Sequence, residues 1–316
     1  MSFPTRINVA IPKDDDGYIG RECPLGACEG YFKIKPGTGL TGNDLPCHCP
    51  YCGHVGSPKE FFTKDQIEFA KSVAKRQLVD VLRHELKKME FDIKPPRGSF
   101  GIGISMKLKP GSPTPLKHYR ERSLETHICC RNCTLDYAVY GVFAFCPDCG
   151  VHNSFQILQK NIDLVRKQLS LAQAQTDDEL KRHLIEDALE NCVSSFDGFA
   201  RESCRIRACR SQDAGKCANI SFQNLHRAAD KVSSLFRIDM KRSVSEADWQ
   251  FAHIASMRRH VIAHRGGVID DQYLAETGER THLRGRRVVV SAGDVVRLSR
   301  IILDVGRFLV EQLPPS

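Results

Sequence analysis

Apolar residues in the second half of the chain recur at the period of an α-helix. Between residues 155 and 172 they fall at steps of three and four, which places them on one helical face. A second helix is predicted after Thr176-Asp177-Asp178-Glu179, which resembles a capping box, and its apolar positions continue to Phe199. Further helices are predicted over residues 222–236, 246–264 and 291–313. The pattern predicts an α-helical bundle for the C-terminal half.

The first half of the chain has shorter alternating segments and one long helical segment. Residues 31–35 alternate like a strand and lead into a turn sequence at 36–39. Residues 137–145 are rich in strand formers, and 99–109 offer another strand. Residues 64–89 predict a long amphipathic helix, ended by the sequence Asp92-Ile93-Lys94-Pro95-Pro96. The predicted fold class is therefore α+β, with two small β modules before an all-α bundle.

No part of the sequence predicts a membrane span or a signal peptide. No apolar run approaches the roughly 18 to 20 residues that a spanning helix needs. The N-terminal sequence Met-Ser-Phe-Pro-Thr-Arg-Ile lacks the basic start and apolar core of a secretion signal. We therefore expect a cytoplasmic protein without a membrane partner.

The cysteines add chemistry to this outline, because ten of the fourteen lie in two groups before residue 150. Both groups contain Cys-Pro-x-Cys-Gly, at residues 49–53 and 146–150. The backbone N–H groups of this short turn point toward the sulfurs, which suits two thiolates that bind one tetrahedral zinc ion. Thiols are also expected to stay reduced in a chain without a signal peptide. The clustering therefore favours zinc over disulfides.

The first group predicts a zinc ribbon, in which two cysteine pairs are joined by a hairpin over residues 31–39. The ligands predicted for this zinc ion are Cys23, Cys28, Cys49 and Cys52. Four residues separate the first two cysteines, where two are usual. Cys47 is a spare thiol that could be a substitute ligand or a neighbour of the metal. His48 and His54 are further candidates that rank below the cysteines.

The second group predicts a second zinc ribbon. Its predicted ligands are Cys130, Cys133, Cys146 and Cys149. Two Cys-x2-Cys pairs separated by twelve residues are a strong zinc signal, and residues 137–145 would supply the hairpin. Cys129 is a spare thiol, because the two-residue spacing to Cys133 favours Cys130 as the ligand. The predicted domains are thus ribbon 1 (1–60), a connecting helix (61–92), ribbon 2 (93–154) and the helical bundle (155–316).

Both zinc ions are expected to be structural. A catalytic zinc keeps one position open for water, whereas four thiolates close the coordination shell. Zinc binding can supply on the order of 10 kcal/mol to the folding of a small ribbon. Ribbons present surfaces to nucleic acid or to protein partners, and the spacing leaves both open. Cys204, Cys209 and Cys217 match no zinc spacing and are expected to be structural cysteines.

The net charge of +8 is compatible with a polyanionic partner. The segment from Asp92 to Glu125 contains three acidic residues and seven basic ones. The basic residues are Lys94, Arg97, Lys107, Lys109, Lys117, Arg120 and Arg122. This region could contact RNA, or it could be a solvated basic loop.

The most informative segment is residues 257–270, where polar residues interrupt a helix that ends at two glycines. The sequence Arg259-His260-x3-His264 resembles the Arg, polar residue, three residues, His motif of the HEPN superfamily (higher eukaryotes and prokaryotes nucleotide-binding). Residues 264–274 are similar to the branch of RNase L-like nucleases. The resemblance covers about residues 155–316, including a strand at 286–291 and the last helix.

This resemblance implies a dimeric, metal-independent endoribonuclease, plausible as a stress or phage-defence effector. His264 would be the acid/base for attack of the RNA 2′-hydroxyl on the adjacent phosphate, because imidazole titrates near neutral pH. Arg259 would stabilise charge on that phosphate, and His260 would support the site. Gly266 stands where some toxin branches of the family carry a tyrosine, which argues against membership of those branches.

Helix geometry leaves alternatives open. Five residues rotate through about 140° on an ideal helix, so Arg259 and His264 would not share a face. Either the helix unwinds near Gly266 or the site combines side chains of two protomers. His260 and His264 do share a face, so a metal site that includes His253 is conceivable, although Val261 excludes a His-Glu-x-x-His peptidase motif. The remaining alternative is a bundle that binds nucleic acid or a partner without catalysis.

Overall fold

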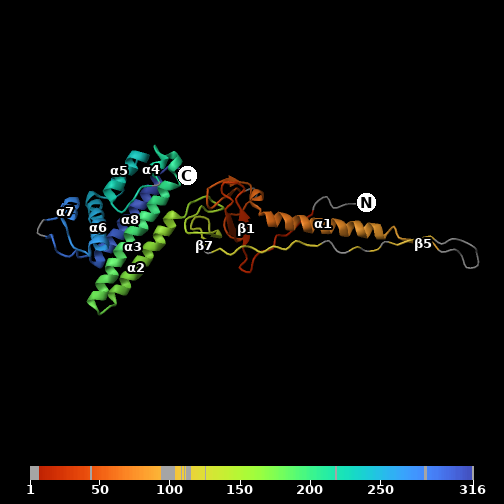
Figure 1. The fold of residues 1–316 in the computed structure, drawn as a ribbon, viewed down its shortest axis with the longest axis horizontal. Helices are drawn as coiled ribbons and strands as arrows, with labels where there is room; N and C mark the ends of the chain where they lie inside the picture. Colours follow the sequence, from red (N-terminus) through yellow and green to blue (C-terminus); the bar gives the residue numbers. More distant parts are fainter. Residues whose placement is uncertain are drawn as a thin grey trace, which may run out of the picture. The chain divides into compact units, whose positions relative to one another are not determined.

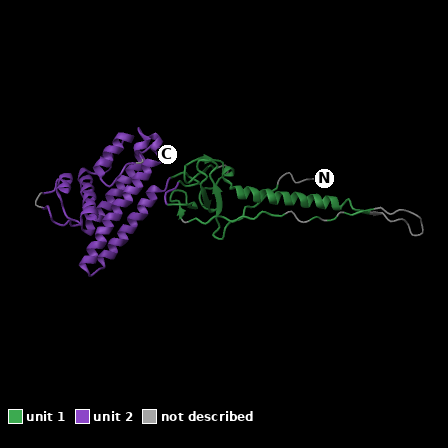
Figure 2. Cartoon of the chain, viewed as in Figure 1, with its two compact units in different colours: residues 1–141, 145–151 green, residues 142–144, 152–316 purple. Residues whose placement is uncertain are grey.

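The structure of the chain is a computed structural model that divides into two compact units. It describes residues 7–42, 45–93, 104–107, 109, 111, 115–124, 126–217, 219–280 and 283–314. Unit 1 comprises residues 1–141 and 145–151, and unit 2 comprises residues 142–144 and 152–316 (Figure 2). Unit 1 contains both cysteine groups, and unit 2 contains the helical bundle.

Unit 1 is built on a four-stranded antiparallel sheet. Its strands are β1 (Ile19–Glu22), β2 (Tyr31–Ile34), β7 (Thr126–Cys129) and β8 (Asp136–Val139), in the spatial order β1-β2-β8-β7. Each hairpin closes at the first cysteine pair of its group. The hairpins predicted over residues 31–39 and 137–145 are wrong, because each of these segments supplies only the second strand of a hairpin. In each half the turn of the first cysteine pair reverses the chain. The strands before these turns, β1 and β7, were not predicted from the sequence.

The two halves of this sheet repeat one design. Ile19 pairs with Ile34 in the first half, and Thr126 pairs with Val139 at the equivalent positions of the second. In both halves the first strand ends directly before a cysteine, and the second begins three residues after the next cysteine. The halves meet antiparallel where Lys33 lies opposite Ala138. Unit 1 is therefore an internal repeat with an approximate twofold axis between β2 and β8.

Smaller elements follow the second cysteine pair of the first half. Strands β3 (Cys47–His48) and β4 (Val55–Gly56) flank this pair, and the turn η1 (Pro58–Phe61) leads into helix α1 (Lys64–Lys87). Thr63 and Gln66 form a capping box that starts α1. The predicted strand at residues 99–109 lies partly outside the described residues, and β6 (Ile104–Met106) pairs with β5 (Phe91–Ile93).

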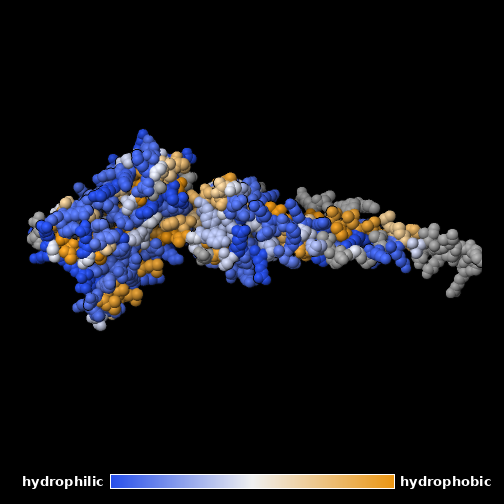
Figure 3. All heavy atoms as spheres, viewed as in Figure 1, coloured by the Kyte–Doolittle hydropathy of each residue, from blue (hydrophilic) through white to orange (hydrophobic). Residues whose placement is uncertain are grey.

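Helix α1 leaves much of its apolar side exposed. Ile7, Val9 and Ile11 line a cavity of about 470 Å³ along its first turns. Further along, Leu78 and Leu82 are exposed, and apolar side chains are visible along the helix in Figure 3. A helix with this exposure gains little free energy from burial, so its capping and its charged side chains carry more of its local stability.

Unit 2 is a helical bundle around α2 (Ser154–Gln173) and α3 (Asp178–Arg205), which form a long antiparallel pair (Figure 1). The other long helices are α5 (Leu225–Phe236), α6 (Glu246–Arg265) and α8 (Ala292–Gln312). Short elements join them: η2 (Ala208–Arg210), α4 (Ala214–Cys217), η3 (Met240–Ser243) and α7 (Asp271–Thr277). Helix α8 packs against α2, α3 and α6.

The core of the bundle is large and apolar. Leu158 and Ile162 of α2 are fully buried, as are Phe196 and Phe199 of α3. Gly306 lets α8 approach this core, because a Cβ atom there would lie 2.9 Å from the Leu158 side chain. The buried residues of α2 and α3 are among the apolar positions whose helical period predicted the bundle.

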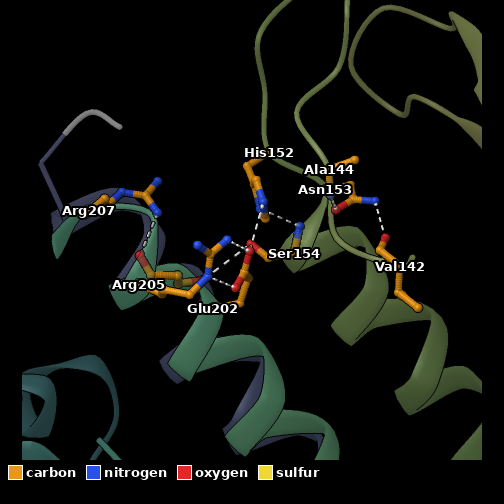
Figure 4. Close-up of polar contacts among 9 residues, drawn as sticks. Val142, Ala144, His152, Asn153, Ser154, Glu202, Arg205 and Arg207 are labelled. Carbon is orange, nitrogen blue, oxygen red and sulfur yellow. Dashed lines mark hydrogen bonds and ion pairs between the residues drawn. The ribbon is translucent and has the colours of Figure 1, made fainter. Parts of the chain in front are cut away.

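A buried polar cluster fixes the start of α2 (Figure 4). His152 lies 3.5 Å from the Glu202 carboxylate, which also accepts two hydrogen bonds from Arg205 at 2.6 and 2.7 Å. Asn153 accepts the N–H of Ala144 at 2.8 Å and donates to the carbonyl of Val142 at 2.9 Å. The Ser154 N–H at the start of α2 donates to His152 Nδ1 at 3.2 Å, which pairs one of the N–H groups that a helix start leaves without a partner.

The predicted α+β fold class is confirmed: small antiparallel sheets with two four-cysteine clusters precede a helical bundle. The strand expected at residues 286–291 is absent, and this described segment contributes only a single bridge between Arg287 and Val268. The short helix α7 was not predicted. No helix in the described part of the chain combines the length and apolar character required to cross a membrane.

Candidate functional site

The eight predicted zinc ligands form two separate groups of four. In each group the sulfur atoms lie within 4.8 Å of one another. The groups are Cys23, Cys28, Cys49 and Cys52, and Cys130, Cys133, Cys146 and Cys149. The structure thus brings together the cysteines in the combinations that their spacing predicted.

The sulfur separations fit a tetrahedral zinc ion. Cys23 and Cys52 are 3.7 Å apart between Sγ atoms, as are Cys28 and Cys49. In the second group the separations are 3.7 Å for Cys130–Cys149 and 3.5 Å for Cys133–Cys146. Zinc–sulfur bonds of about 2.3 Å at tetrahedral angles require sulfurs about 3.8 Å apart. All these cysteines are free thiols, so each group can hold a metal ion such as zinc.

All four cysteine turns have the same backbone design. Directly after each second cysteine stands a residue with positive φ: Glu29, Gly53, Thr134 and Gly150. In three turns the N–H of this residue donates to the carbonyl of the first cysteine, as from Gly53 to Cys49 at 3.0 Å. In the wider turn the N–H of Glu29 donates instead to the Leu25 carbonyl at 2.9 Å. The N–H of the first cysteine donates across the turn in all four cases, here from Cys23 to the Gly30 carbonyl at 3.0 Å. The four-residue spacing therefore still positions both sulfurs.

Burial affects the protonation of these thiols. Burial raises the pKa of Cys23 and of Cys133 to about 11, so both carry protons at neutral pH when no metal is bound. Backbone hydrogen bonds from Leu25 and Leu135 oppose part of this rise because they favour the thiolates. A bound cation would replace the protons and use the same hydrogen bonds.

The two Cys-Pro-x-Cys-Gly turns pack on each other with the symmetry of the sheet. The His48 N–H donates to the Pro147 carbonyl at 2.7 Å, and the Phe145 N–H donates to the Pro50 carbonyl at 2.8 Å. These residues occupy equivalent positions in the two motifs. The Tyr51 hydroxyl also accepts the N–H of Tyr140, from the other repeat, at 3.0 Å. Direct hydrogen bonds therefore join the two turns that carry the candidate metal centres.

The remaining cysteines lie outside the two groups. Cys47 is buried, and burial raises the pKa of its thiol to about 12, whereas Cys129 is exposed. In the bundle Cys192, Cys204 and Cys217 are buried and Cys209 is exposed. Among the described residues none of these six belongs to a metal-binding group. His48 and His54 are also outside both groups.

Arg259 of α6 is buried against α3. Its guanidinium contacts Glu190 at 2.5 Å, and it donates longer hydrogen bonds to Ser194 at 3.3 Å and to Gln223 at 3.4 Å. The arginine side chain is only 8% exposed, whereas Glu190 is 39% exposed, so the pair lies at the edge of the bundle. The Nε atom of Arg259 is buried without a partner among the described residues.

His260 and His264 are neighbours near the end of α6. Their ring centroids are 4.8 Å apart, and His264 is exposed. Burial, with the nearby His264 and Arg259, lowers the pKa of His260 below its ordinary value, which favours a neutral imidazole at neutral pH. Helix α6 stays regular to Arg265 and ends where Gly266 takes a positive φ of 60°. The helix therefore does not unwind between the predicted site residues.

Beyond α6, two backbone segments pair and present arginines. Ile269 donates its N–H to the carbonyl of Arg286 at 3.0 Å, and Val288 donates to Gly267 at 2.8 Å. Four arginines of this loop pair are exposed: Arg265, Arg284, Arg286 and Arg287. Three of them have a carboxylate within 4 Å, and the described part of the chain offers none to Arg286.

Of the seven basic residues expected between residues 92 and 125, the structure describes five. Lys94 and Arg97 lie outside the described residues. Lys117 pairs with Glu68 at 2.6 Å, and the Arg122 guanidinium lies 5.0 Å from the centre of the Tyr31 ring.

The chain has no match among protein-family models, curated proteins or solved structures. The candidate site is therefore defined by its own geometry. Sequence reasoning missed Glu190, the partner of Arg259. A signal existed in principle, because Glu186, Glu190 and Ser194 recur at four-residue steps on α3, but a row of polar residues at this step also marks a solvated helix face.

Proposed function

We propose that unit 2 is a metal-independent endoribonuclease of the HEPN type and that unit 1 holds two structural zinc ions. The observation that carries this proposal is the pair of imidazoles of His260 and His264 beside Arg259 at the end of α6. An imidazole side chain can accept and donate a proton in the cleavage of a phosphodiester.

The proposed reaction uses the RNA as its own nucleophile. His264 accepts the proton of the 2′-hydroxyl, whose oxygen attacks the adjacent phosphorus. The bond from phosphorus to the 5′ oxygen breaks, and that oxygen takes up a proton, which leaves a 2′,3′-cyclic phosphate and a 5′-hydroxyl. The His260 ring lies 4.8 Å from that of His264 between centroids, and its neutral form would donate a hydrogen bond to the phosphate through its one N–H.

Arg259 contributes positive charge from inside the bundle. Glu190 holds its guanidinium, and the same charge helps to keep His260 neutral. Because Arg259 and the exposed His264 lie on different sides of a regular helix, we propose that a homodimer completes the phosphate site with groups of both protomers. The exposed arginines of residues 265–287 would bind neighbouring phosphates of the RNA.

The zinc ions would act on structure alone. Four thiolates in each group leave no coordination position for water, so the metal would supply folding energy and no reactive species. The ribbons would then grip the RNA or a protein partner with a rigid surface. This role is consistent with the repeated, tightly turned design of the two halves of unit 1.

The test is cleavage of a mixed single-stranded RNA by the purified protein in EDTA, with analysis of the product ends. Wild type should cut and leave cyclic phosphates, and His264→Ala and Arg259→Ala should lose cleavage. His183→Ala is the matched control, because His183 is an exposed histidine of α3 that does not belong to the motif. Intact RNA with wild type, or cleavage by His264→Ala at the wild-type rate, would reject the nuclease.

One observation favours a second function, a non-catalytic nucleic-acid-binding or adaptor protein. Arg259 is buried in an ion pair with Glu190, which is also what a purely structural arginine would do. If this function is correct, RNA binding persists without cleavage, and substitution of Lys107, Lys109 and Arg120 in unit 1 abolishes it.

A further inference from the structure

A second cavity lies at the other end of α6. It has a volume of about 830 Å³ and is lined by His226 of α5, Lys241 of η3 and residues of the first turn of α6, with Trp249 among them. Ligand pockets typically measure about 300 to 1,000 Å³. Trp249 is fifteen residues before His264, which is about 22 Å along a helix axis. The cavity is therefore separate from the proposed nuclease site.

Three aromatic rings beside the cavity are parallel. The ring of His226 lies 3.7 Å from that of His253, with an angle of 6° between their planes. The ring of Trp249 is inclined by only 4° to that of His226, at a centroid distance of 6.2 Å. Two of these rings, His226 and Trp249, line the cavity. Parallel rings at a cavity wall offer a stacking surface for another flat ring.

Polar groups at the cavity have unused hydrogen-bonding capacity. The indole N–H of Trp249 is buried, and it finds no acceptor among the described residues. Trp249 itself is 96% buried, since 4% of its surface is exposed. Gln250 and Glu246 line the cavity and are exposed, and they add a donor and acceptors. Gln250 and Glu246 are therefore the polar groups that a ligand in the cavity can reach.

Lys241 supplies the positive charge of the cavity. Within the described chain no carboxylate lies within ion-pair distance of its ammonium group, whereas its neighbour Arg242 pairs with Asp239 at 3.4 Å. Burial, the nearby His253 and the charge of Lys241, in this order, lower the pKa of the His226 imidazole. The Lys241 ammonium group is therefore close enough to His226 to affect its protonation. A flat heteroaromatic ring with polar edges and an attached anion matches these groups better than an aliphatic ligand does.

We infer that this cavity binds a nucleotide, with its base stacked on His226 beside Trp249 and its phosphate at Lys241. The polar edge of the base would meet Gln250 and Glu246. Base stacking on aromatic side chains with a nearby cation is a common way to hold nucleotides. A free mononucleotide and the terminal nucleotide of an RNA share this chemistry. The inference does not depend on the nuclease activity.

Trp249 is the single tryptophan of the chain, so its fluorescence reports on this cavity alone. The full-length protein is titrated slightly above neutral pH with AMP, GMP, adenosine, inorganic tripolyphosphate and a short 5′-phosphorylated RNA, and the affinities are repeated by calorimetry. AMP or GMP should change the emission saturably, with a Kd at or below about 1 mM. Adenosine should bind at least several-fold more weakly, and tripolyphosphate should not change the emission. A response to the RNA alone would assign the cavity to an RNA end.

The matched variants are Lys241→Gln and Lys231→Gln, since Lys231 is exposed on α5 and does not line the cavity. Lys241→Gln should weaken AMP binding by about tenfold, the loss of one charge-assisted contact of about 1.4 kcal/mol. Lys231→Gln should bind as wild type does. Absence of a saturable response to every nucleotide and to the RNA, or equal binding by the two variants, would overturn the inference.

Discussion

The two units are stabilised in different ways. Unit 1 has small two- and four-stranded sheets, and its buried cysteines converge on two points where a metal ion fits. Unit 2 has a continuous apolar core supplied by five long helices. The hydrophobic core of unit 2 can sustain a fold by itself, whereas a module as small as one ribbon rarely buries enough apolar surface to do so. Stability in unit 1 should therefore depend on metal, and in unit 2 on packing.

The largest expected effect is on a metal ligand. Cys146→Ser should lower the bound zinc from two ions to one and destabilise unit 1, because one site supplies on the order of 10 kcal/mol. Native mass spectrometry would give the zinc content, and hydrogen exchange would show loss of protection in β7 and β8 with unit 2 unchanged. The control is Cys129→Ser, an exposed thiol outside both groups, which should keep both ions. Equal zinc content in the two variants would contradict the ligand assignment.

The next effect is on the core of the bundle. Phe196 is 1% exposed and packs edge-on against Phe222, so Phe196→Ala should lower the free energy of unfolding of unit 2 by about 3 to 5 kcal/mol. Zinc content should stay at two ions. Leu164→Ala on the exposed side of α2 is the control and should change stability by less than about 0.5 kcal/mol. Loss of zinc from Phe196→Ala would mean that the two units do not fold independently.

A smaller effect should appear at the start of the bundle. Glu202→Gln should cost about 1.5 to 3 kcal/mol, because it removes charge-assisted hydrogen bonds from Arg205 and the contact with His152. Despite burial, these partners lower the pKa of Glu202 to about 2. A lowered folded-state pKa gives stability that is present above the unfolded value of about 4.3 and is lost as the pH falls toward 2.

Urea unfolding of wild type and Glu202→Gln at several pH values would check this sign. The difference between the two proteins should be full at neutral pH and should shrink between about pH 4 and pH 2. Glu179→Gln is the control, because its side chain is 85% exposed. A difference that grows on acidification would show that Glu202 is not held as a carboxylate.

The smallest effect concerns the contact between the two repeats of unit 1. The Tyr51 hydroxyl donates to the carbonyl of Tyr31 at 2.6 Å and accepts the N–H of Tyr140. Tyr51→Phe should lower the stability of unit 1 by about 1 kcal/mol per lost hydrogen bond. We expect zinc to pass to a chelator faster from this variant than from wild type, and the rate of that transfer is the measurement. Tyr140→Phe removes an exposed hydroxyl and should leave this rate unchanged. Identical rates for the two variants would remove Tyr51 from the account of how the repeats are joined.

The sequence predicted the elements whose signal is local. The spacings of the cysteine pairs predicted the grouping of the eight cysteines, and the helical periods predicted the long helices of unit 2, because each pattern is complete within a short segment. The joining of β2 to β8 was not predictable in this way. It depends on two strands about a hundred residues apart. Neither segment alone contains a sequence signal for the pairing of Lys33 with Ala138.

The candidate site shows the same limit. The motif placed Arg259 and His264 on one helix, but it did not reveal that the arginine is buried against α3 and held by Glu190. The parallel rings of His226 and Trp249 were also missed, because they come from different helices and each is an ordinary core residue in its own segment. Contacts between helices depend on how the helices pack. The periodicity of a sequence predicts which face of a helix is apolar, but not which residues of another helix that face will contact.

The central claim is that the bundle performs the chemistry and that the zinc ribbons support it from outside. The most direct test is the single-turnover rate of RNA cleavage at saturating RNA for wild type, His264→Ala and Cys146→Ser. The account predicts a loss of about 100- to 10,000-fold for His264→Ala with RNA affinity retained. It predicts a rate near that of wild type for Cys146→Ser, with weaker RNA binding. Cleavage by His264→Ala at the wild-type rate, or loss of the chemical step with Cys146→Ser alone, would contradict it.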